Sequence, residues 1–169
     1  MIRPFRGILP AVAPSAFIDQ SAQVIGDVVV GDECGIWMNV VVRGDVNYIR
    51  IGDRSNIQDL TMVHVMRGTH PTVVGDDVTV GHSALLHGCT IGNVCLIGMG
   101  AQLMNGATVG DCSIVAAGSL LTEGFVAPPR SLVMGRPARV KRELTDDEIE
   151  TIRGYARRYV EYRKDYMEP

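Results

Sequence analysis

The sequence predicts a mainly β fold, in which parallel strands build a solenoid of about six coils and one α-helix follows at the C-terminal end. Three observations favour this fold class. An aliphatic residue recurs every six positions through most of the chain, glycine often follows it within two positions, and the last stretch changes to a helical pattern. A chain of 169 residues is within the usual size of one domain, so we expect a single domain over residues 1–169.

The repeated aliphatic positions predict the strands. A helix would repeat every 3.6 residues and a lone strand would alternate over a short run, whereas a sustained six-residue period is typical of a hexapeptide solenoid with three short strands per coil. The period breaks three times, with three extra residues after Val42, five extra after Val63 and one fewer after Leu86. Over residues 12–126 the first face then carries Val12, Val30, Ile51, Val74, Ile91 and Val109, the second Ile18, Ile36, Ile57, Val80, Ile97 and Val115, and the third Val24, Val42, Val63, Leu86, Leu103 and Leu121.

The C-terminal part predicts a connecting loop over residues 127–144 and a helix over 145–166. Thr145 and Glu148 have the spacing of a capping box, and Asp146 and Asp147 suit a helix N-terminus. One face of this helix can lie on the solenoid, since the following residues have helical spacing: Ile149, Ile152, Ala156, Tyr159 and Arg163.

Composition argues against several classes of protein. The net charge is −3 and the basic residues are spread along most of the chain, so we expect no nucleic acid partner. No apolar run approaches the roughly 18 residues of a membrane span, and the start lacks the apolar core of a signal peptide, so we expect a cytoplasmic protein without a membrane partner. The cysteines form no C-x-x-C pair and are expected to be small, buried and reduced: Cys34, Cys89, Cys95 and Cys112.

Two of the four histidines are expected to stack. His64 follows Val63 and His87 follows Leu86, so both lie one position after a third-face residue in consecutive coils. Their side chains should point outward, about 4.8 Å apart, which allows two imidazoles to share one metal ion. Arg43 extends this column by one coil.

His82 belongs to another face. It lies two positions after Val80, on the second face, and should not reach the stacked pair within one narrow coil. It is either unrelated to the pair or arrives from another copy of the chain, as a threefold homotrimer would allow. Asp59 should stack under His82, with Gln58 beside it. For His70, in the five-residue insertion, an ordinary loop histidine is expected.

Several motifs carry a resemblance to a known family. RGDVNYIRIG at 43–52, NIQD at 56–59, His64 and GHSALLHG at 81–88 resemble the gamma-class carbonic anhydrases, and the likeness extends over GRPARV and the final helix. The resemblance implies a left-handed parallel β-helix and a homotrimer with active sites between subunits.

The same resemblance implies roles for individual residues. The metal ligands would be His64 and His87 from one subunit and His82 from its neighbour. An ion-pair network of Arg43, Asp45 and Asp59 would hold adjacent subunits in register. The catalytic residues would be Gln58, beside the metal-bound solvent, and Tyr159 on the C-terminal helix.

Two departures concern proton transfer. Val46 stands where the best-known enzyme of the family has a glutamate, and the loop VMRGTHP lacks the carboxylates of that enzyme's acidic loop. His70 could act as the proton shuttle instead, because imidazole titrates near neutral pH.

A site of three neutral histidines predicts metal-assisted hydration of carbon dioxide. Such a site leaves one coordination position open for water, as in catalytic zinc centres. Zn²⁺ is the first expectation, with Fe²⁺ or Co²⁺ also suited to imidazole, one ion per subunit interface. The resulting hydroxide would attack carbon dioxide and give bicarbonate, with Gln58 orienting it. The alternatives are a metal-dependent thioesterase or other hydrolase, a hexapeptide acyltransferase using coenzyme A, and a non-catalytic trimeric scaffold.

Overall fold

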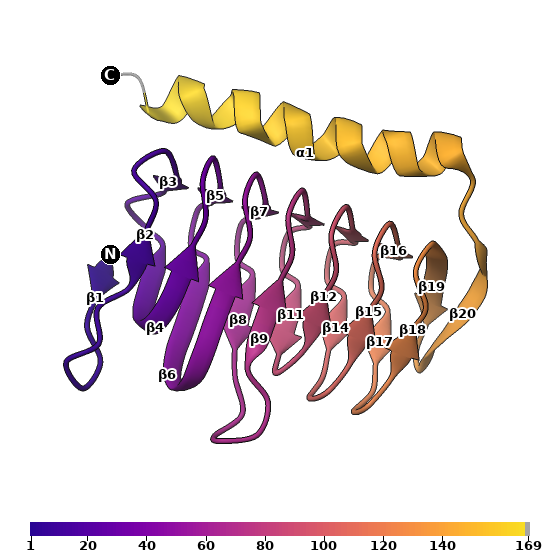
Figure 1. Cartoon of the computed structure of the whole chain (residues 1–169), viewed down its shortest axis with the longest axis horizontal. Coiled ribbons are helices and arrows are strands. Elements are labelled where there is room, and N and C mark those ends of the chain that lie inside the picture. Colours follow the sequence, from indigo (N-terminus) through magenta and orange to yellow (C-terminus); the bar gives the residue numbers. More distant parts are fainter. Residues whose placement is uncertain (168–169) are drawn as a thin grey trace.

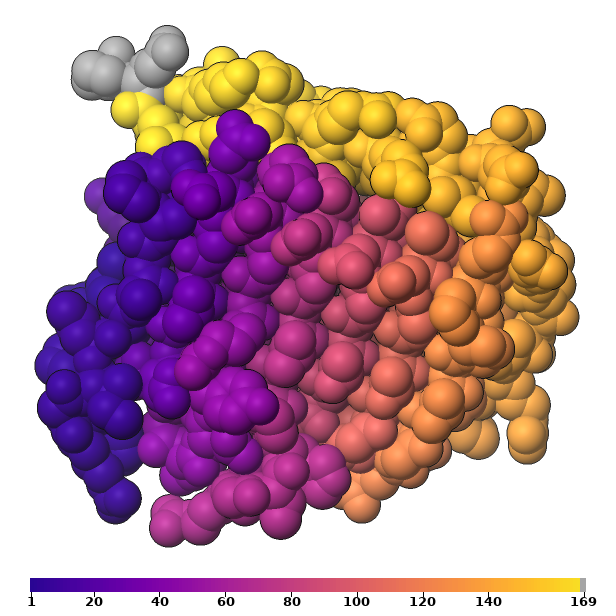
Figure 2. Space-filling model, in the orientation of Figure 1, coloured from indigo at the N-terminus to yellow at the C-terminus, as the bar shows by residue number. Residues whose placement is uncertain are grey.

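Stacked parallel coils form the body of the molecule, and one long helix runs across them (Figure 1). The structure is a computed structural model and describes residues 1–167. Every predicted repeat residue pairs with its counterpart one coil away, as in the run from Val42 to Val63 to Leu86 to Leu103. All three faces have the predicted register, so the parallel solenoid is confirmed. Figure 2 shows the coils as adjacent bands in chain order.

Two sheets make the three faces. The first and third faces share a 12-stranded sheet, because β4 and β6 continue around the corner from one face to the next. Its strands are β1 (Ile2–Arg3), β2 (Ala11–Val12), β4 (Gln23–Val30), β6 (Val41–Ile51), β8 (Met62–His64), β9 (Thr72–Val74), β11 (Leu85–His87), β12 (Thr90–Ile91), β14 (Gln102–Leu103), β15 (Thr108–Val109), β17 (Leu120–Leu121) and β18 (Val126–Ala127). The second face is an 8-stranded sheet of β3 (Phe17–Ile18), β5 (Gly35–Ile36), β7 (Asn56–Ile57), β10 (Thr79–Val80), β13 (Leu96–Ile97), β16 (Ile114–Val115), β19 (Ser131–Gly135) and β20 (Ala138–Glu143).

The solenoid is longer than predicted, with about seven turns rather than six. Ala127 pairs with Val109 on the first face, and Val133 pairs with Val115 on the second. The expected connecting loop over 127–144 is therefore wrong, because it contains β19 and β20, which pair antiparallel to each other. β20 adds the only antiparallel pairing between named strands in residues 1–167 and caps this end of the second-face sheet.

The interior is a column of aliphatic side chains. The predicted repeat residues are at most 2% exposed, except Val12 and Ile18, which are half-buried in the first coil. The cysteines are free thiols, and burial raises the pKa of Cys34, Cys89 and Cys95 to about 12. These three thiols therefore act as small core residues.

A ladder of side-chain hydrogen bonds runs along one corner of the solenoid. In four successive steps, an Asp or Asn oxygen accepts the backbone N–H of the matching residue one coil earlier, at 2.7–2.9 Å. The ladder comprises Asp32, Asp53, Asp76, Asn93 and Asp111. Each member directly follows a glycine, which explains the recurrent Gly-Asp and Gly-Asn pairs of the sequence.

The helix α1 (Asp146–Met167) lies on the outside of the second face. Ile149 and Ile152 pack on outward-pointing residues of that face, including Leu96, Ile114 and Leu132. At the far end, Arg163 donates to the Ser15 carbonyl in the first coil (2.8 Å) and to Glu33 in the second coil (2.9 Å). The predicted helical face is confirmed, with Tyr159 half-buried. Helices within residues 1–167 are too short or too polar to cross a membrane.

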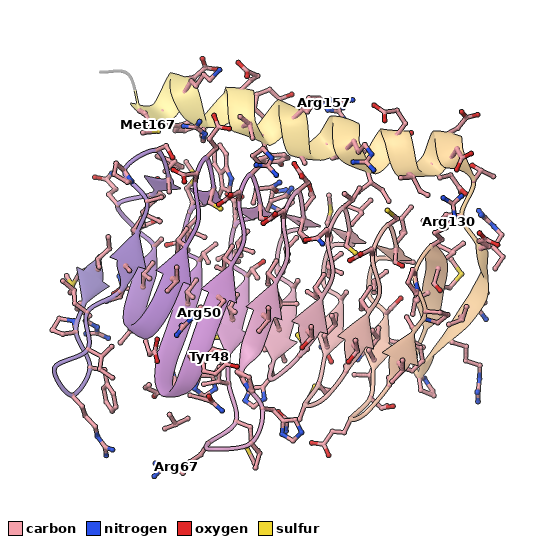
Figure 3. The ribbon with its side chains drawn as sticks, viewed as in Figure 1. Tyr48, Arg50, Arg67, Arg130, Arg157 and Met167 are labelled. Atoms are coloured by element: carbon pink, nitrogen blue, oxygen red, sulfur yellow. The ribbon has the colours of Figure 1, made fainter. Side chains whose placement is uncertain are left out.

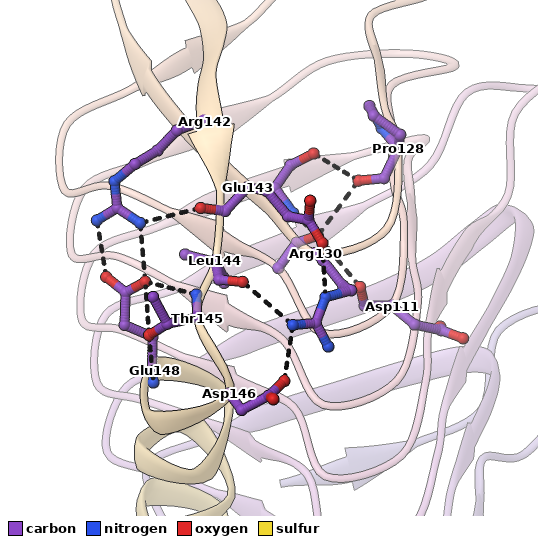
Figure 4. A network of polar contacts seen from close by, with 11 residues as sticks. Asp111, Pro128, Arg130, Arg142, Glu143, Leu144, Thr145, Asp146 and Glu148 are labelled. Carbon is purple, nitrogen blue, oxygen red and sulfur yellow. Dashed lines mark hydrogen bonds and ion pairs between the residues drawn. The ribbon is translucent and has the colours of Figure 1, made fainter.

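The predicted capping box starts this helix (Figure 4). Glu148 accepts the backbone N–H of Thr145 (2.9 Å), and the Thr145 hydroxyl accepts the backbone N–H of Glu148 (3.3 Å). Arg142 on β20 also pairs with Glu148, at 2.7 and 2.8 Å. The hydrogen bonds from Arg142, followed by that from the Thr145 backbone, lower the pKa of Glu148 to about 2.

The buried column should tolerate truncation poorly. Leu121 is fully buried, while its neighbour Leu120 points outward. We expect Leu121→Ala to lower the free energy of unfolding by about 2–5 kcal/mol, because it leaves a cavity among packed aliphatic groups. Leu120→Ala, the matched control, should cost much less in the same chemical denaturation experiment. Equal losses would contradict the inward orientation of Leu121.

The cap should make stability depend on acid pH. Because the folded pKa of Glu148 lies below its ordinary value of 4.5, its contribution is complete above about pH 4.5 and is lost as the pH falls toward 2. Glu148→Gln should therefore melt at a lower temperature than wild type at pH 6, with a smaller difference at pH 3. Glu161→Gln, beyond the cap on the same helix, is the control. A difference that does not change with pH would argue against the charged cap.

Candidate metal centre

His64 and His87 face each other at the ends of β8 and β11. The two residues are paired in register, one coil apart. His64 Nδ1 lies 3.2 Å from His87 Nε2, and the ring centroids are 5.1 Å apart. Thr72, which is fully buried, donates to the His64 carbonyl and accepts the backbone N–H of Gly88, so the two backbones are also tied together. The predicted stacking of these two histidines is confirmed.

The remaining nitrogen of His64 is held by Asp45. His64 Nε2 lies 3.0 Å from Asp45 Oδ1, and Arg43 pairs with the other Asp45 oxygen. Burial alone would raise the pKa of Asp45, but hydrogen bonds from His64 and Arg43 hold it below its usual value. Burial lowers the pKa of His64, which outweighs the opposing hydrogen bond to Asp45. Asp45 is therefore an anionic acceptor beside a neutral imidazole.

These partners determine which nitrogen of each ring carries the proton. An ionised carboxylate can only accept, so His64 Nε2 carries the hydrogen. His87 Nδ1 lies 2.7 Å from Asn105 Oδ1, which is also only an acceptor, so His87 Nδ1 carries the hydrogen. In these neutral tautomers, the nitrogens without hydrogen are His64 Nδ1 and His87 Nε2, which point at each other.

Two lone pairs at 3.2 Å repel unless a cation lies between or beside them. Two imidazole nitrogens, each about 2.1 Å from a tetrahedral metal ion, lie about 3.4 Å apart. Histidines that bind metal also commonly donate their other N–H to a carboxylate or carbonyl. The pair thus fits a metal ion in its spacing, its protonation and its outer hydrogen bonds.

His82 lies apart from this pair, at the second face. His82 Nδ1 is 3.0 Å from Asp59 Oδ2, which confirms that Asp59 stacks next to His82. Within residues 1–167 of one chain, no group of three or more His, Cys, Asp and Glu side chains is placed to hold a metal. Arg43 pairs with Asp45 whereas Asp59 pairs with His82, so the three members of the expected ion-pair network are not joined within one chain.

A groove of about 280 Å³ separates His82 from the helix. Gln58 lines it, almost fully buried, and donates to Asn56 Oδ1 (3.1 Å). Tyr159 lines the other side and packs edge-on against Trp37, with centroids 5.4 Å apart. Burial, then the charge of Asp59, raises the pKa of Tyr159. The two expected catalytic residues therefore share one groove with His82.

His70 occupies the inserted hairpin between β8 and β9, where Met66 pairs with it. Figure 3 marks Arg67 near the tip of this loop. His70 Nδ1 contacts the Thr69 hydroxyl (2.9 Å), and its ring lines a hollow with Asn105 and Glu123. Val46 lines a different hollow, with Asp45. His70 is thus near the outer partner of His87.

The sequence reasoning missed Asn105, Glu123 and Thr72. Asn105 is two positions after Leu103, on the coil next to His87, so the same face count could have placed it near the pair. Glu123, two after Leu121, continues the column. Thr72 gave no signal, because the inserted hairpin interrupts the period just before it.

The fold defines a hexapeptide-repeat protein, and the paired histidines are a candidate metal-binding site on one face of its solenoid. Residues 88–123 match the bacterial transferase hexapeptide (six repeats) model. The chain is 54% identical to a protein named "Probable carbonic anhydrase" from Methanocaldococcus jannaschii, over 88% of this chain and 93% of that protein. It is 46% identical to "Gamma carbonic anhydrase 1, mitochondrial" from Arabidopsis thaliana, over 89% of this chain and 56% of that protein.

A solved hexapeptide transferase family protein from Anaplasma phagocytophilum superposes with a TM-score of 0.94, at 42% identity over 98% of this chain and 97% of that one. The chain belongs to the gamma-class carbonic anhydrase family of hexapeptide-repeat proteins.

The paired histidines should control metal content. We expect the wild type, loaded with Zn²⁺ and washed, to retain metal and to melt at a higher temperature than the metal-free protein, because binding to the folded state stabilises it. His87→Ala should lose most of this metal and the accompanying shift. His70→Ala, the control, should retain both in elemental analysis and thermal melting. Equal metal content in all three proteins would contradict the assignment.

Proposed function

We propose that this protein hydrates carbon dioxide to bicarbonate at a metal site between two copies of the chain. His64 and His87 come from one subunit and His82 from its neighbour in a homotrimer. The observation that carries the proposal is the facing pair of imidazole nitrogens, His64 Nδ1 and His87 Nε2, 3.2 Å apart, with Asp45 and Asn105 at the other nitrogen of each ring. Two ligands leave the coordination incomplete, and a third histidine from a neighbour completes a three-histidine centre with one open position.

The surface around His82 supports its assignment to a subunit interface. His82 and Asp59 are each about two-fifths exposed although they pair with each other. Leu60 and Met99, which flank them, are exposed at 63% and 59%. Large apolar side chains beside a polar pair are typical of a surface that another subunit covers. A cyclic arrangement would repeat the same contact three times.

The chain's own residues supply binding and orientation. His64, His87 and His82 would hold a divalent cation, Zn²⁺ before Fe²⁺ or Co²⁺, and such an ion would supply hydroxide near neutral pH by lowering the pKa of a water molecule. Asp45 and Asn105 hold the two imidazoles in the ligating tautomers. Gln58, buried and anchored by Asn56, orients the attacking oxygen or the carbon dioxide. Tyr159 closes the groove on the helix side and limits access of bulk water.

Proton transfer is assigned to His70. Its ring lines an open hollow with Glu123, beside Asn105, which contacts His87. An imidazole that lines an open hollow can exchange a proton with buffer. His70 would thereby replace the family's acidic loop in proton transfer, because Val46 and the loop VMRGTHP offer no carboxylate.

The names of the relatives leave two chemistries to compare. Two relatives are named carbonic anhydrases, while the solved structure from Anaplasma phagocytophilum is described as a transferase family protein. An acyltransferase needs one catalytic histidine as a base and no facing pair with matched outer acceptors. The His64–His87 geometry therefore favours the hydratase.

Subunit complementation tests both the activity and the shared site. His82→Ala in one chain and His64→Ala with His87→Ala in another should each abolish metal-dependent hydration of carbon dioxide. Co-expression with two different tags allows mixed trimers to be isolated. Each mixed trimer has one intact site of three, so we expect about one third of wild-type activity, in stopped-flow assays after anaerobic loading with Zn²⁺ or Fe²⁺.

Other outcomes discriminate the alternatives. Mixed trimers that stay inactive, beside an active wild type, would place the third ligand in the same chain. A metal-loaded wild-type trimer without hydration above buffer would overturn the carbonic anhydrase assignment. Thioester hydrolysis or acetyl transfer from coenzyme A would then indicate the hydrolase or the acyltransferase, and their absence a scaffold.

A further inference from the structure

The outer hydrogen bond of His87 belongs to a chain of three side chains on successive coils. Asn105 Oδ1 lies 2.7 Å from His87 Nδ1, and Asn105 Nδ2 donates to Glu123 Oε1 at 3.0 Å. The register pairs Leu86 with Leu103 and Leu103 with Leu121, so the three residues follow the coil order. None of the sequence motifs that resemble the family includes Asn105 or Glu123.

Glu123 fixes which way the Asn105 amide points. A carboxylate only accepts hydrogen bonds, so it favours the NH₂ group of Asn105 and repels its carbonyl oxygen. With the NH₂ group toward Glu123, the carbonyl oxygen faces His87 Nδ1 and can only accept. The reversed amide would place a donor against Nδ1 and would favour the opposite tautomer of His87, whose Nε2 carries a hydrogen and cannot bind a metal.

Gly88 provides the space for this contact. Its φ is +61°, and a Cβ built there would lie 2.6 Å from Asn105 Oδ1 and 2.8 Å from the His70 Cβ. Any side chain at position 88 would therefore displace the amide from His87. Gly88, directly after His87 at the end of β11, is thus a requirement of the Asn105 contact.

We propose that Asn105 and Glu123 are positioning residues of the metal centre. Glu123 orients Asn105, and Asn105 accepts the Nδ1 hydrogen of His87, so the Nε2 lone pair points toward His64. This inference rests on the proposed metal site. Partners of this kind typically contribute 10–100-fold to metal affinity.

Zinc affinity of the trimer, measured by competition with a chromophoric chelator, tests the inference. Asn105→Leu should weaken zinc binding about 10–100-fold. Asn105→Asp, which keeps an acceptor for His87, should bind zinc more tightly than Asn105→Leu does. Glu123→Ala should weaken zinc binding less than Asn105→Leu does. Glu123→Gln keeps a carbonyl oxygen for the Asn105 amide, so its zinc affinity should lie close to that of the wild type. Glu161→Ala, a surface glutamate on α1, is the control.

The double variant separates positioning from a general effect. If Glu123 acts through Asn105, adding Glu123→Ala to Asn105→Leu should change zinc affinity by less than about twofold. Melting of the metal-free proteins shows whether the fold is intact. Two results would overturn this inference alone, provided that the wild type binds zinc. One is an unchanged zinc affinity in Asn105→Leu and Glu123→Ala, and the other is additive losses of affinity in the double variant. A wild type that binds no zinc would overturn the proposed site as well.

Discussion

Parallel hydrogen bonding between successive coils holds Leu86 against Val63 and thereby brings His87 onto His64. A side chain at the same place in the next coil is always one strand spacing away, about 4.8 Å. The fully buried aliphatic column maintains this register, because a slip of one residue would turn its side chains outward. The paired histidines, the ladder from Asp32 to Asp111 and the link from His87 to Glu123 all depend on that repeat.

The repeat also explains why His82 lies apart from the stacked pair His64 and His87 within one chain. Stacking places residues of one face close together along the solenoid axis, but it separates the faces from one another. His64 and His87 share a face, while His82 lies on another with Asp59, Gln58 and Tyr159. The helix reinforces this division, since it packs on the second face and walls the groove beside His82.

The six-residue period was enough to predict the three faces, their register and the histidine pair, while the spacing of Thr145 and Glu148 predicted the capping box. The predicted solenoid ended one turn early. Ala127 is a small repeat residue, and Pro128 and Pro129 directly after it are typical of a loop. The period likewise could not show β20, which pairs antiparallel. Asn105 and Glu123 escaped because their roles depend on side-chain orientation and on the space left by Gly88, neither of which a repeat count contains.

Arg163 has a consequence for how the chain is made. It donates hydrogen bonds to the Ser15 carbonyl in the first coil, 148 positions earlier, and to Glu33 in the second coil. Translation delivers the first coils early and the helix last, so these coils remain without these hydrogen bonds throughout synthesis. Until the helix is made, the first two coils are held together only by their own strand pairing and buried side chains.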